Sequence, residues 1–249
     1  MLRTSNPALS EKIFRKSVAE SGAQTMTING SIQKTALLVL LTVAGASYTW
    51  SKFLSAGPEM VQGWMIGGAI GGFIAAMVIV FKRNLAKYVA PIYAVLEGLF
   101  LGAISAYFNA MFPAEGIVMR AITLTFGVLF AMLMLYRAGI IKPTKKFRAG
   151  VMAATGGVAL VYFVTIIANM FGANLTFMYE SSPLGIGISL VIVIIASLNL
   201  ILDFDFIEKG SQAGLDKNME WYAAFGLMVT LIWLYIEILR LLALFAGRD

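Results

Sequence analysis

Long uninterrupted apolar runs are the feature that most constrains how this chain folds. A bilayer core of about 30 Å requires roughly 20 helical residues at about 1.5 Å each. Runs of this length recur about seven times, separated only by short polar segments. Charged residues make up 13% of the chain, about half the share typical of soluble domains. The sequence therefore predicts an all-α integral membrane protein, a bundle of seven transmembrane helices. The predicted spans are 35–54, 63–81, 89–111, 118–137, 150–171, 184–206 and 221–245.

The spans leave no room for a separate soluble domain, so we divide the chain into an N-terminal tail (1–33) and a transmembrane domain (34–249). The apolar spacing within residues 9–18 suits either a short interfacial helix or a disordered basic tail. Fifteen Lys and Arg lie on the side of this tail and four on the other. The positive-inside rule then predicts a cytoplasmic N-terminus and an outward C-terminus. The net charge of +6 reflects orientation and contact with the lipid bilayer, with no nucleic-acid partner expected.

The chain contains no histidine and no cysteine. This excludes Ser-His and Cys-His catalysis, zinc sites of the His/Cys type, haem held by His or Cys, and iron–sulfur clusters. The last span has no lysine for a retinal Schiff base, and Asp203 and Asp205 occupy one helix rather than two facing helices. We therefore expect a protein that is not an enzyme and that has no cofactor.

Glycines recur at four-residue spacing in the second and third predicted spans. Such spacing lets helix backbones approach closely where lipid provides no hydrophobic drive for association. We interpret these glycines as packing positions. They are Gly67, Gly68, Gly71 and Gly72 in one span, and Gly98 and Gly102 in the other.

Five acidic residues lie within or at the ends of the predicted spans, where an unpaired charge is costly. They are Glu97, Asp203, Asp205, Glu220 and Glu237. Glu97 lies deep enough to need a partner, a proton or water, and a structural hydrogen bond to a neighbouring helix is the alternative to a functional role. Asp203 and Asp205 are expected to close the sixth span. They are about 200° apart around a helix, so they cannot both face one pore.

The remaining acids each have a local structural interpretation. Glu220 follows Asn218, a good N-cap residue, so helix capping alone would explain it. Glu237 precedes Arg240 by three residues, the spacing of an intrahelical ion pair. By the same spacing rules, Asn199 shares a helix face with Asp203, and Thr230 shares one with Glu237.

Three motifs, in the third, sixth and seventh predicted spans, carry a family resemblance. Residues 93–102 (YAVLEGLFLG) look like the Glu-Gly…Gly signature of the transmembrane Bax inhibitor motif family. Residues 201–209 (ILDFDFIEK) are similar to the segment before that family's last helix, and residues 234–242 (LYIEILRLL) resemble its terminal stretch. With the span spacing, the resemblance covers most of the chain from about residue 33.

The resemblance implies a fold in which six helices surround the last one. It also implies a pH-sensitive calcium leak, with cytoprotection in eukaryotic members and a link to a membrane protease in one bacterial relative. The family's gate is a pair of aspartates that share a proton when closed. Asp203 matches the first, and Thr230 stands where the second is expected. Threonine can donate a hydrogen bond but cannot share a proton as a second carboxylate does.

Another acid could therefore replace the missing aspartate. Asp205 faces away from Asp203, Glu237 lies further out, and Glu220 lies on the same side of the membrane. We predict that Asp203 and Glu220 form an acidic pair that binds calcium transiently. The other candidate residues of the ion pathway are Glu97, Thr230, Asp205, Glu237 and Asn199.

The leading functional hypothesis is a passive, pH-sensitive calcium leak channel gated by intramembrane carboxylates. The alternative is a membrane interaction protein that modulates a membrane protease or a stress or cell-death response. A coupled transporter is less supported, because the sequence has no repeat symmetry. The absence of cysteine and of long outer loops favours a bacterial inner membrane over an organelle.

Overall fold

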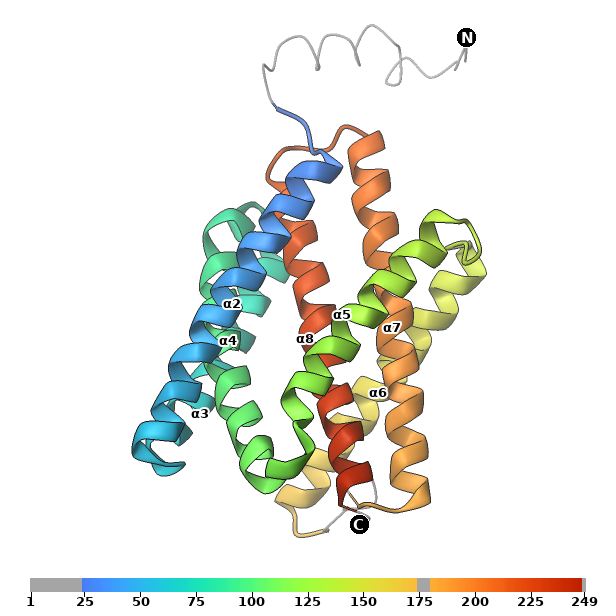
Figure 1. Ribbon diagram of the computed structural model, residues 1–249. Coiled ribbons are helices and arrows are strands. Elements are labelled where there is room, and N and C mark those ends of the chain that lie inside the picture. Colours follow the sequence, from blue (N-terminus) through green and yellow to red (C-terminus); the bar gives the residue numbers. More distant parts are fainter. Residues whose placement is uncertain (1–23, 174–179, 248–249) are drawn as a thin grey trace, which may run out of the picture.

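The computed structural model describes residues 24–173 and 180–247, which form a bundle of seven long helices (Figure 1). Each of these helices is long and apolar enough to cross a membrane. The possible interfacial helix within residues 9–18 lies outside the described residues. The long helices are α2 (Ile28–Ala56), α3 (Glu59–Phe81), α4 (Ala86–Met111), α5 (Ile117–Arg137), α6 (Lys145–Met170), α7 (Pro183–Gln212) and α8 (Met219–Ala246). Two single 3₁₀ turns, η2 (Arg83–Leu85) and η3 (Pro113–Glu115), precede α4 and α5.

The last helix lies at the centre of the bundle, with α2 and α4 on one side and α5 and α7 on the other (Figure 1). Of its apolar span, 61% is buried inside the protein, against 11% for α6 at the periphery. Met228 and Ile232 join a cluster with α2, α3 and α4, whereas Leu227 and Leu234 join a second cluster with α5 and α7. Opposite sides of α8 thus pack against different helices. The predicted central position of the last helix is confirmed.

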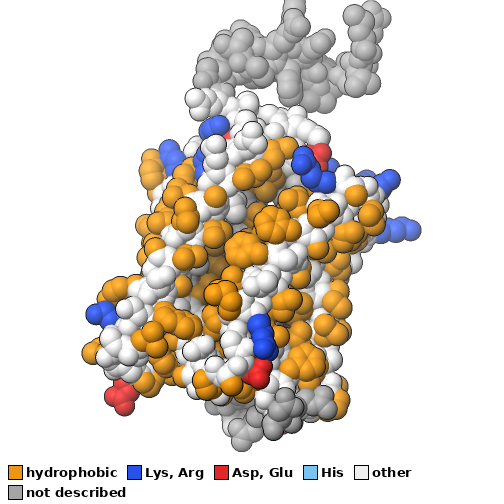
Figure 2. All heavy atoms as spheres, in the orientation of Figure 1, with side chains coloured by type: hydrophobic (Ala, Val, Ile, Leu, Met, Phe, Trp, Pro, Cys, Tyr) orange, Lys and Arg blue, Asp and Glu red, His pale blue; other side chains and the backbone are white. Residues whose placement is uncertain are grey.

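Side-chain polarity divides the surface into bands. Hydrophobic side chains cover the middle of the bundle, and charged ones gather toward its two ends (Figure 2). We call the end where α2 begins at Ile28 the N-terminal end, and α8 finishes at the opposite end (Figure 1). This banding is what a bilayer requires of a protein that spans it.

The first helix is longer than its apolar run, because it begins at Ile28 and not near residue 35. Its first turns fall within the segment that the sequence assigned to the tail. The Thr27 side chain accepts a 2.9 Å hydrogen bond from the amide of Gly30 and caps the helix. Polar residues can extend a membrane helix beyond the apolar core, and a hydropathy pattern does not detect such an extension.

The sixth span departs further from expectation. Asp203 and Asp205 do not close α7, which continues to Gln212. Two pairs of polar residues continue the helix, and the members of each pair are one turn apart. Lys209 lies 2.7 Å from Asp205, and Gln212 donates to Glu208 at 3.2 Å. Asp203 and Asp205 therefore lie inside a helix rather than at its frayed end.

The segment before α2 is tied to the connection between α7 and α8. The amide of Met26 donates to the Leu215 carbonyl at 2.7 Å, and the amide of Lys217 donates to the Gln24 carbonyl at 3.1 Å. Thr25 and Asp216 form an isolated antiparallel bridge between these donors. The first described residues thus meet the α7–α8 connection at the N-terminal end of the bundle.

The predicted packing role of the glycines holds for some positions and not for others. A Cβ on Gly98 would collide with the Thr42 backbone of α2, and one on Gly68 would lie 2.6 Å from the Leu96 carbonyl oxygen of α4. In contrast, a Cβ on Gly67 would meet nothing within 4 Å. Spacing identifies the glycine-rich helix, but only the helix that packs against it determines which glycines are needed.

We predict that Gly98→Ala destabilises the protein and that Gly67→Ala does not. The added methyl group at residue 98 has to push α2 away from α4, and overpacking of this kind costs about 1–3 kcal/mol. Thermal denaturation of the purified protein in detergent, followed by circular dichroism, measures the difference. Equal melting temperatures for the two variants would show that the close approach of α2 and α4 is not required.

Candidate functional site

The Asp203 carboxylate lies at the interface between α7 and α8. Its Oδ1 is beside Gly226, where an added Cβ would be 3.9 Å away. The Thr230 side chain is its polar neighbour, and the Thr230 hydroxyl also donates to the Gly226 carbonyl at 3.3 Å. The two positions that the family resemblance pairs therefore meet in the structure.

The second carboxylate oxygen of Asp203 is in an unusual environment. This atom, Oδ2, is buried and has no hydrogen-bond partner within the described residues. A buried carboxylate without a donor is costly, and a proton, a water molecule or a cation relieves that cost. The site is therefore one at which the occupancy of a proton or cation changes the energy of the α7–α8 contact.

Glu220, the predicted acidic partner of Asp203, is bound elsewhere. Its side chain is fully buried, and Lys34 and Lys217 lie 2.5 and 3.0 Å from its two oxygens. The backbone amide and the hydroxyl of Thr27 both donate to its Oε1 at 2.9 Å. Gly30 leaves the space that the carboxylate fills. Glu220 thus fastens the first turn of α2 to the first turn of α8.

The capping expected of Asn218 is not observed. Asn218 occupies the position before α8, but its side chain makes no capping hydrogen bond. Its backbone amide instead donates to the Asp216 side chain at 2.8 Å. Glu220 does lie in the first turn of α8, where the helix dipole stabilises a carboxylate, and its ion pairs stabilise it further.

Asp205 belongs to a charged cluster at the N-terminal end of the bundle. Its buried carboxylate binds Arg148 at the start of α6 and Lys209 one turn along α7. Nearby, Glu208 accepts a hydrogen bond from the Tyr136 hydroxyl at the end of α5. These contacts connect α5, α6 and α7, and they provide the Asp205 carboxylate with two cationic partners.

Glu237 and Asn199 connect α6 to the rest of the bundle. The predicted ion pair between Glu237 and Arg240 is confirmed, with a separation of 2.6 Å. Glu237 also accepts from the Tyr162 hydroxyl of α6 and from the Trp233 indole at 3.3 Å. The amide of Asn199 donates to the Thr155 hydroxyl of α6 at 2.8 Å.

Glu97 is half-buried on α4 and faces α3. A Cβ on Gly72 would lie 2.6 Å from the Glu97 carboxylate, so the glycine leaves room for the acid. No hydrogen bond or ion pair joins this carboxylate to another residue in the part of the chain that the structure describes. Glu97 and Asp203 are thus the two candidate acids without a cationic partner there.

Sequence reasoning missed most of the partners of these acids. In the sequence, Lys34 and Arg148 count only among the charges that set orientation, and no local pattern points to Tyr162. Lys217 and Lys209 gave a local signal, because Lys217 precedes Glu220 by three residues and Lys209 follows Asp205 by four. Within residues 24–173 and 180–247, no group of three or more acidic side chains could hold a metal ion.

These features define a multi-pass membrane protein in which a central last helix makes buried polar contacts with the helices around it. The sequence matches the family described as Bax inhibitor 1 like over residues 6–247, nearly the whole chain. The chain therefore belongs to the Bax inhibitor 1 like family, as the three motifs predicted. A comparison with curated proteins finds no match.

We predict that Glu220→Gln lowers stability strongly, whereas Glu115→Gln has little effect. The first change leaves two lysines beside a neutral buried side chain, and breaking a buried ion pair costs about 3–5 kcal/mol. The second removes the partner of Arg120 at an exposed site, where a pair contributes about 0–1 kcal/mol. Chemical denaturation of the two purified variants compares the free energies of unfolding. A small effect at residue 220 would contradict its role as the link between α2 and α8.

Proposed function

We propose that the protein forms a passive, pH-sensitive pathway through which calcium leaks across the membrane, gated at Asp203. The observation that carries the proposal is the buried Oδ2 of Asp203, which has no hydrogen-bond partner among the described residues and belongs to a carboxylate next to Thr230. Membership of the Bax inhibitor 1 like family supports it.

Thr230 provides a physical basis for gating without a second aspartate. When Asp203 is protonated, its hydroxyl donates to the Thr230 oxygen, while Thr230 keeps its own donation to the Gly226 carbonyl. This neutral chain joins α7 to α8 and corresponds to the closed state. When Asp203 loses its proton, the carboxylate competes with Gly226 for the single hydroxyl proton and attracts a cation. Calcium passage then rises as the pH rises through the titration of Asp203.

The ligand chemistry of the candidate pathway suits transient passage. Calcium binds oxygen ligands, and carboxylates are its strongest protein ligands. Of the five candidate acids, Asp203 and Glu97 are available to it, because Asp205, Glu220 and Glu237 have cationic partners within 3.0 Å. A pathway with isolated acids favours entry and release, whereas a storage site needs several ligands at once.

The proposed orientation has the N-terminal end of the bundle in the cytoplasm of a bacterial cell. Lys142 lies exposed at that end between α5 and α6, and Lys145 and Lys146 lie exposed in the first turn of α6. Lys52 and Arg120 lie toward the opposite end. The excess of positive charge on one side supports this assignment under the positive-inside rule.

Calcium influx into proteoliposomes that contain the purified protein tests the gate. In wild type, influx measured with an enclosed calcium indicator is expected to increase with pH. Asp203→Asn keeps the shape of the side chain but stays neutral, so its influx is expected to remain low and independent of pH. Glu208→Gln is the matched control on the same helix, and it is expected to keep the wild-type profile because its partner Tyr136 still has an acceptor. Unchanged influx in folded Asp203→Asn would overturn the proposal.

A separate variant tests the role of Thr230. Thr230→Val preserves the shape of the side chain and removes the hydroxyl that links Asp203 to Gly226. Without this link the closed state is weaker, so we expect the leak at low pH to rise by about fivefold, as the loss of a net hydrogen bond of about 1 kcal/mol predicts. A pH profile that matches wild type would exclude the hydroxyl from gating.

A second candidate function is an interaction protein that modulates a membrane protease or a stress response. The observation in its favour is the limited burial of α6, of which 11% of the apolar span is covered by the rest of the protein. A partner helix would find a long accessible surface there. This function predicts a membrane protein that co-purifies with wild type, and a cellular phenotype that survives Asp203→Asn.

A further inference from the structure

A pocket lies within the membrane-spanning part of the bundle, on the side of α8 away from α7. It has a volume of about 410 Å³ and is formed by α2, α4, α5 and α8. The surface is hollowed between α2 and α5 (Figure 2). We call this pocket the lateral groove. Its residues on α8, from Met228 to Tyr235, fall near the middle of that helix, so the groove is at the depth of the hydrocarbon core.

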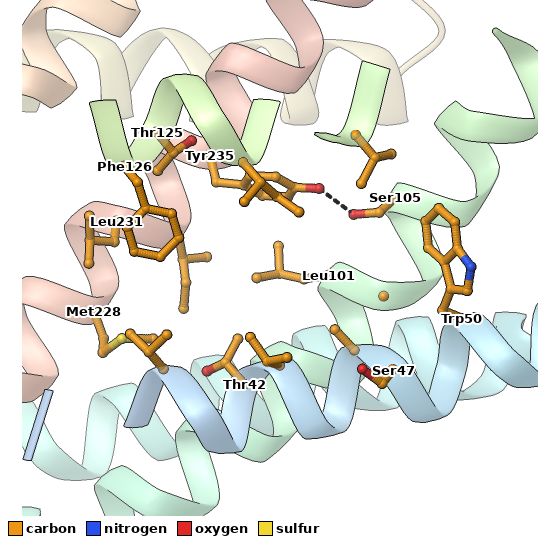
Figure 3. Close-up of a pocket in the computed structure, with 17 residues that line it drawn as sticks. Thr42, Ser47, Trp50, Leu101, Ser105, Thr125, Phe126, Met228, Leu231 and Tyr235 are labelled. Atoms are coloured by element: carbon orange, nitrogen blue, oxygen red, sulfur yellow. Dashed lines mark hydrogen bonds between the residues drawn. The ribbon is translucent and has the colours of Figure 1, made fainter. Parts of the chain in front are cut away.

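The walls of the lateral groove are apolar. Figure 3 shows Leu101, Phe126, Met228 and Leu231 arranged around the empty space. The buried floor comes from α4 and α8, where Leu101 and Leu231 are each 7% exposed. Val43 of α2 and Ile122 of α5 form an accessible rim at 55% and 38% exposure. The groove therefore opens sideways, between two helices, at a level where lipid surrounds the protein.

Four of the six lining residues with side-chain polar groups have internal partners within the described chain, and the exceptions are Ser47 and Trp50. Ser105 and Tyr235 are hydrogen-bonded to each other at 2.6 Å (Figure 3). The hydroxyls of Thr42 and Thr125 donate to the carbonyls of Ala94 and Ala121 at 3.1 and 2.7 Å. Ordered water needs two to four polar partners, and these walls have few groups left to provide them. An occupant of the groove is therefore apolar.

We propose that the lateral groove binds one acyl chain of a bilayer phospholipid. Its volume falls in the range of about 300–1,000 Å³ that is typical of small-molecule sites. An α-helix has a diameter of about 10 Å with its side chains, so a partner helix would rest on the rim of a slot this size. Acyl chains are the apolar molecules present in bulk at this depth. Trp50 lines one end of the groove, and tryptophan is typical of the membrane interface where a lipid headgroup lies.

A bound chain would fill the gap between α2 and α5 and cover the floor on α8. Burial of each methylene group contributes about 0.8 kcal/mol when water is the alternative, and less when lipid is. The favourable free energy of moving an acyl chain from lipid into the groove comes from dispersion contacts that the walls of an empty groove lack. The groove is separate from the Asp203–Thr230 pair, because no residue of α7 lines it.

Photocrosslinking tests the proposal with the full chain in phosphatidylcholine vesicles. The probe is a phosphatidylcholine that carries a diazirine on one acyl chain, and peptide mapping locates the adducts after illumination. Lipids around the protein can reach the rim, but only a chain inside the groove can reach Leu101, Met228 and Leu231. We expect adducts on these floor residues in wild type. A labelled rim with an unlabelled floor would overturn the proposal.

A pair of matched variants sharpens the test. Val43→Phe with Ile122→Phe enlarges two residues of the rim and fills the groove, so floor labelling is expected to fall about tenfold, the equivalent of about 1.4 kcal/mol. Leu40→Phe with Met119→Phe introduces two phenylalanines at exposed positions outside the groove and is expected to leave labelling unchanged. Equal floor labelling in two folded variants would contradict the proposal. If a second copy or a partner helix covers the groove, the wild-type floor stays unlabelled until the protein is diluted, which also overturns it.

Discussion

Burial of α8 on every side is the constraint on which the rest of the structure depends. A helix in lipid has no hydrophobic reason to move inward, so close packing and polar contacts have to hold it there. The two apolar clusters meet on α8, and its acids reach outward to α2 and α6. α5 and α7 pack most extensively against α8, whereas α2 and α4 pack more against each other and α3 packs against α4.

The acids of the bundle separate into two groups by their surroundings. Glu220, Asp205 and Glu237 have cationic partners and hold helices together. Asp203 and Glu97 have none among the described residues, and Gly72 leaves the room that Glu97 occupies. In an apolar medium a buried carboxylate without a cationic partner needs a proton, water or a cation, whereas a paired one does not. Acid position along a span does not reveal this difference, because the sequence places Glu220 and Asp203 on the same side of the membrane.

The sequence predicted the fold more completely than the contacts of the candidate site. Apolar run length defines a membrane helix, so each predicted span corresponds to a long helix in the structure. Helix ends were less accurate, because polar turns such as those at Ile28 and Gln212 continue beyond the apolar core. Local pairs such as Glu237 with Arg240 follow from spacing alone. The contact between Lys34 and Glu220 joins residues 186 positions apart, and no local pattern encodes it.

The tie between the start of α2 and the start of α8 also has a consequence for biosynthesis. Thr27 and Glu220, which hydrogen-bond to each other, are 193 positions apart, so the first described helix receives its anchor only after almost all of the chain has been made. Until then, Lys34 lacks its acidic partner, and the faces of α2 and α4 that α8 covers remain open. Long-range contacts of this kind delay completion of a fold. A truncated chain that ends before α8 would carry these open faces permanently, and membrane quality control could distinguish it from the finished protein.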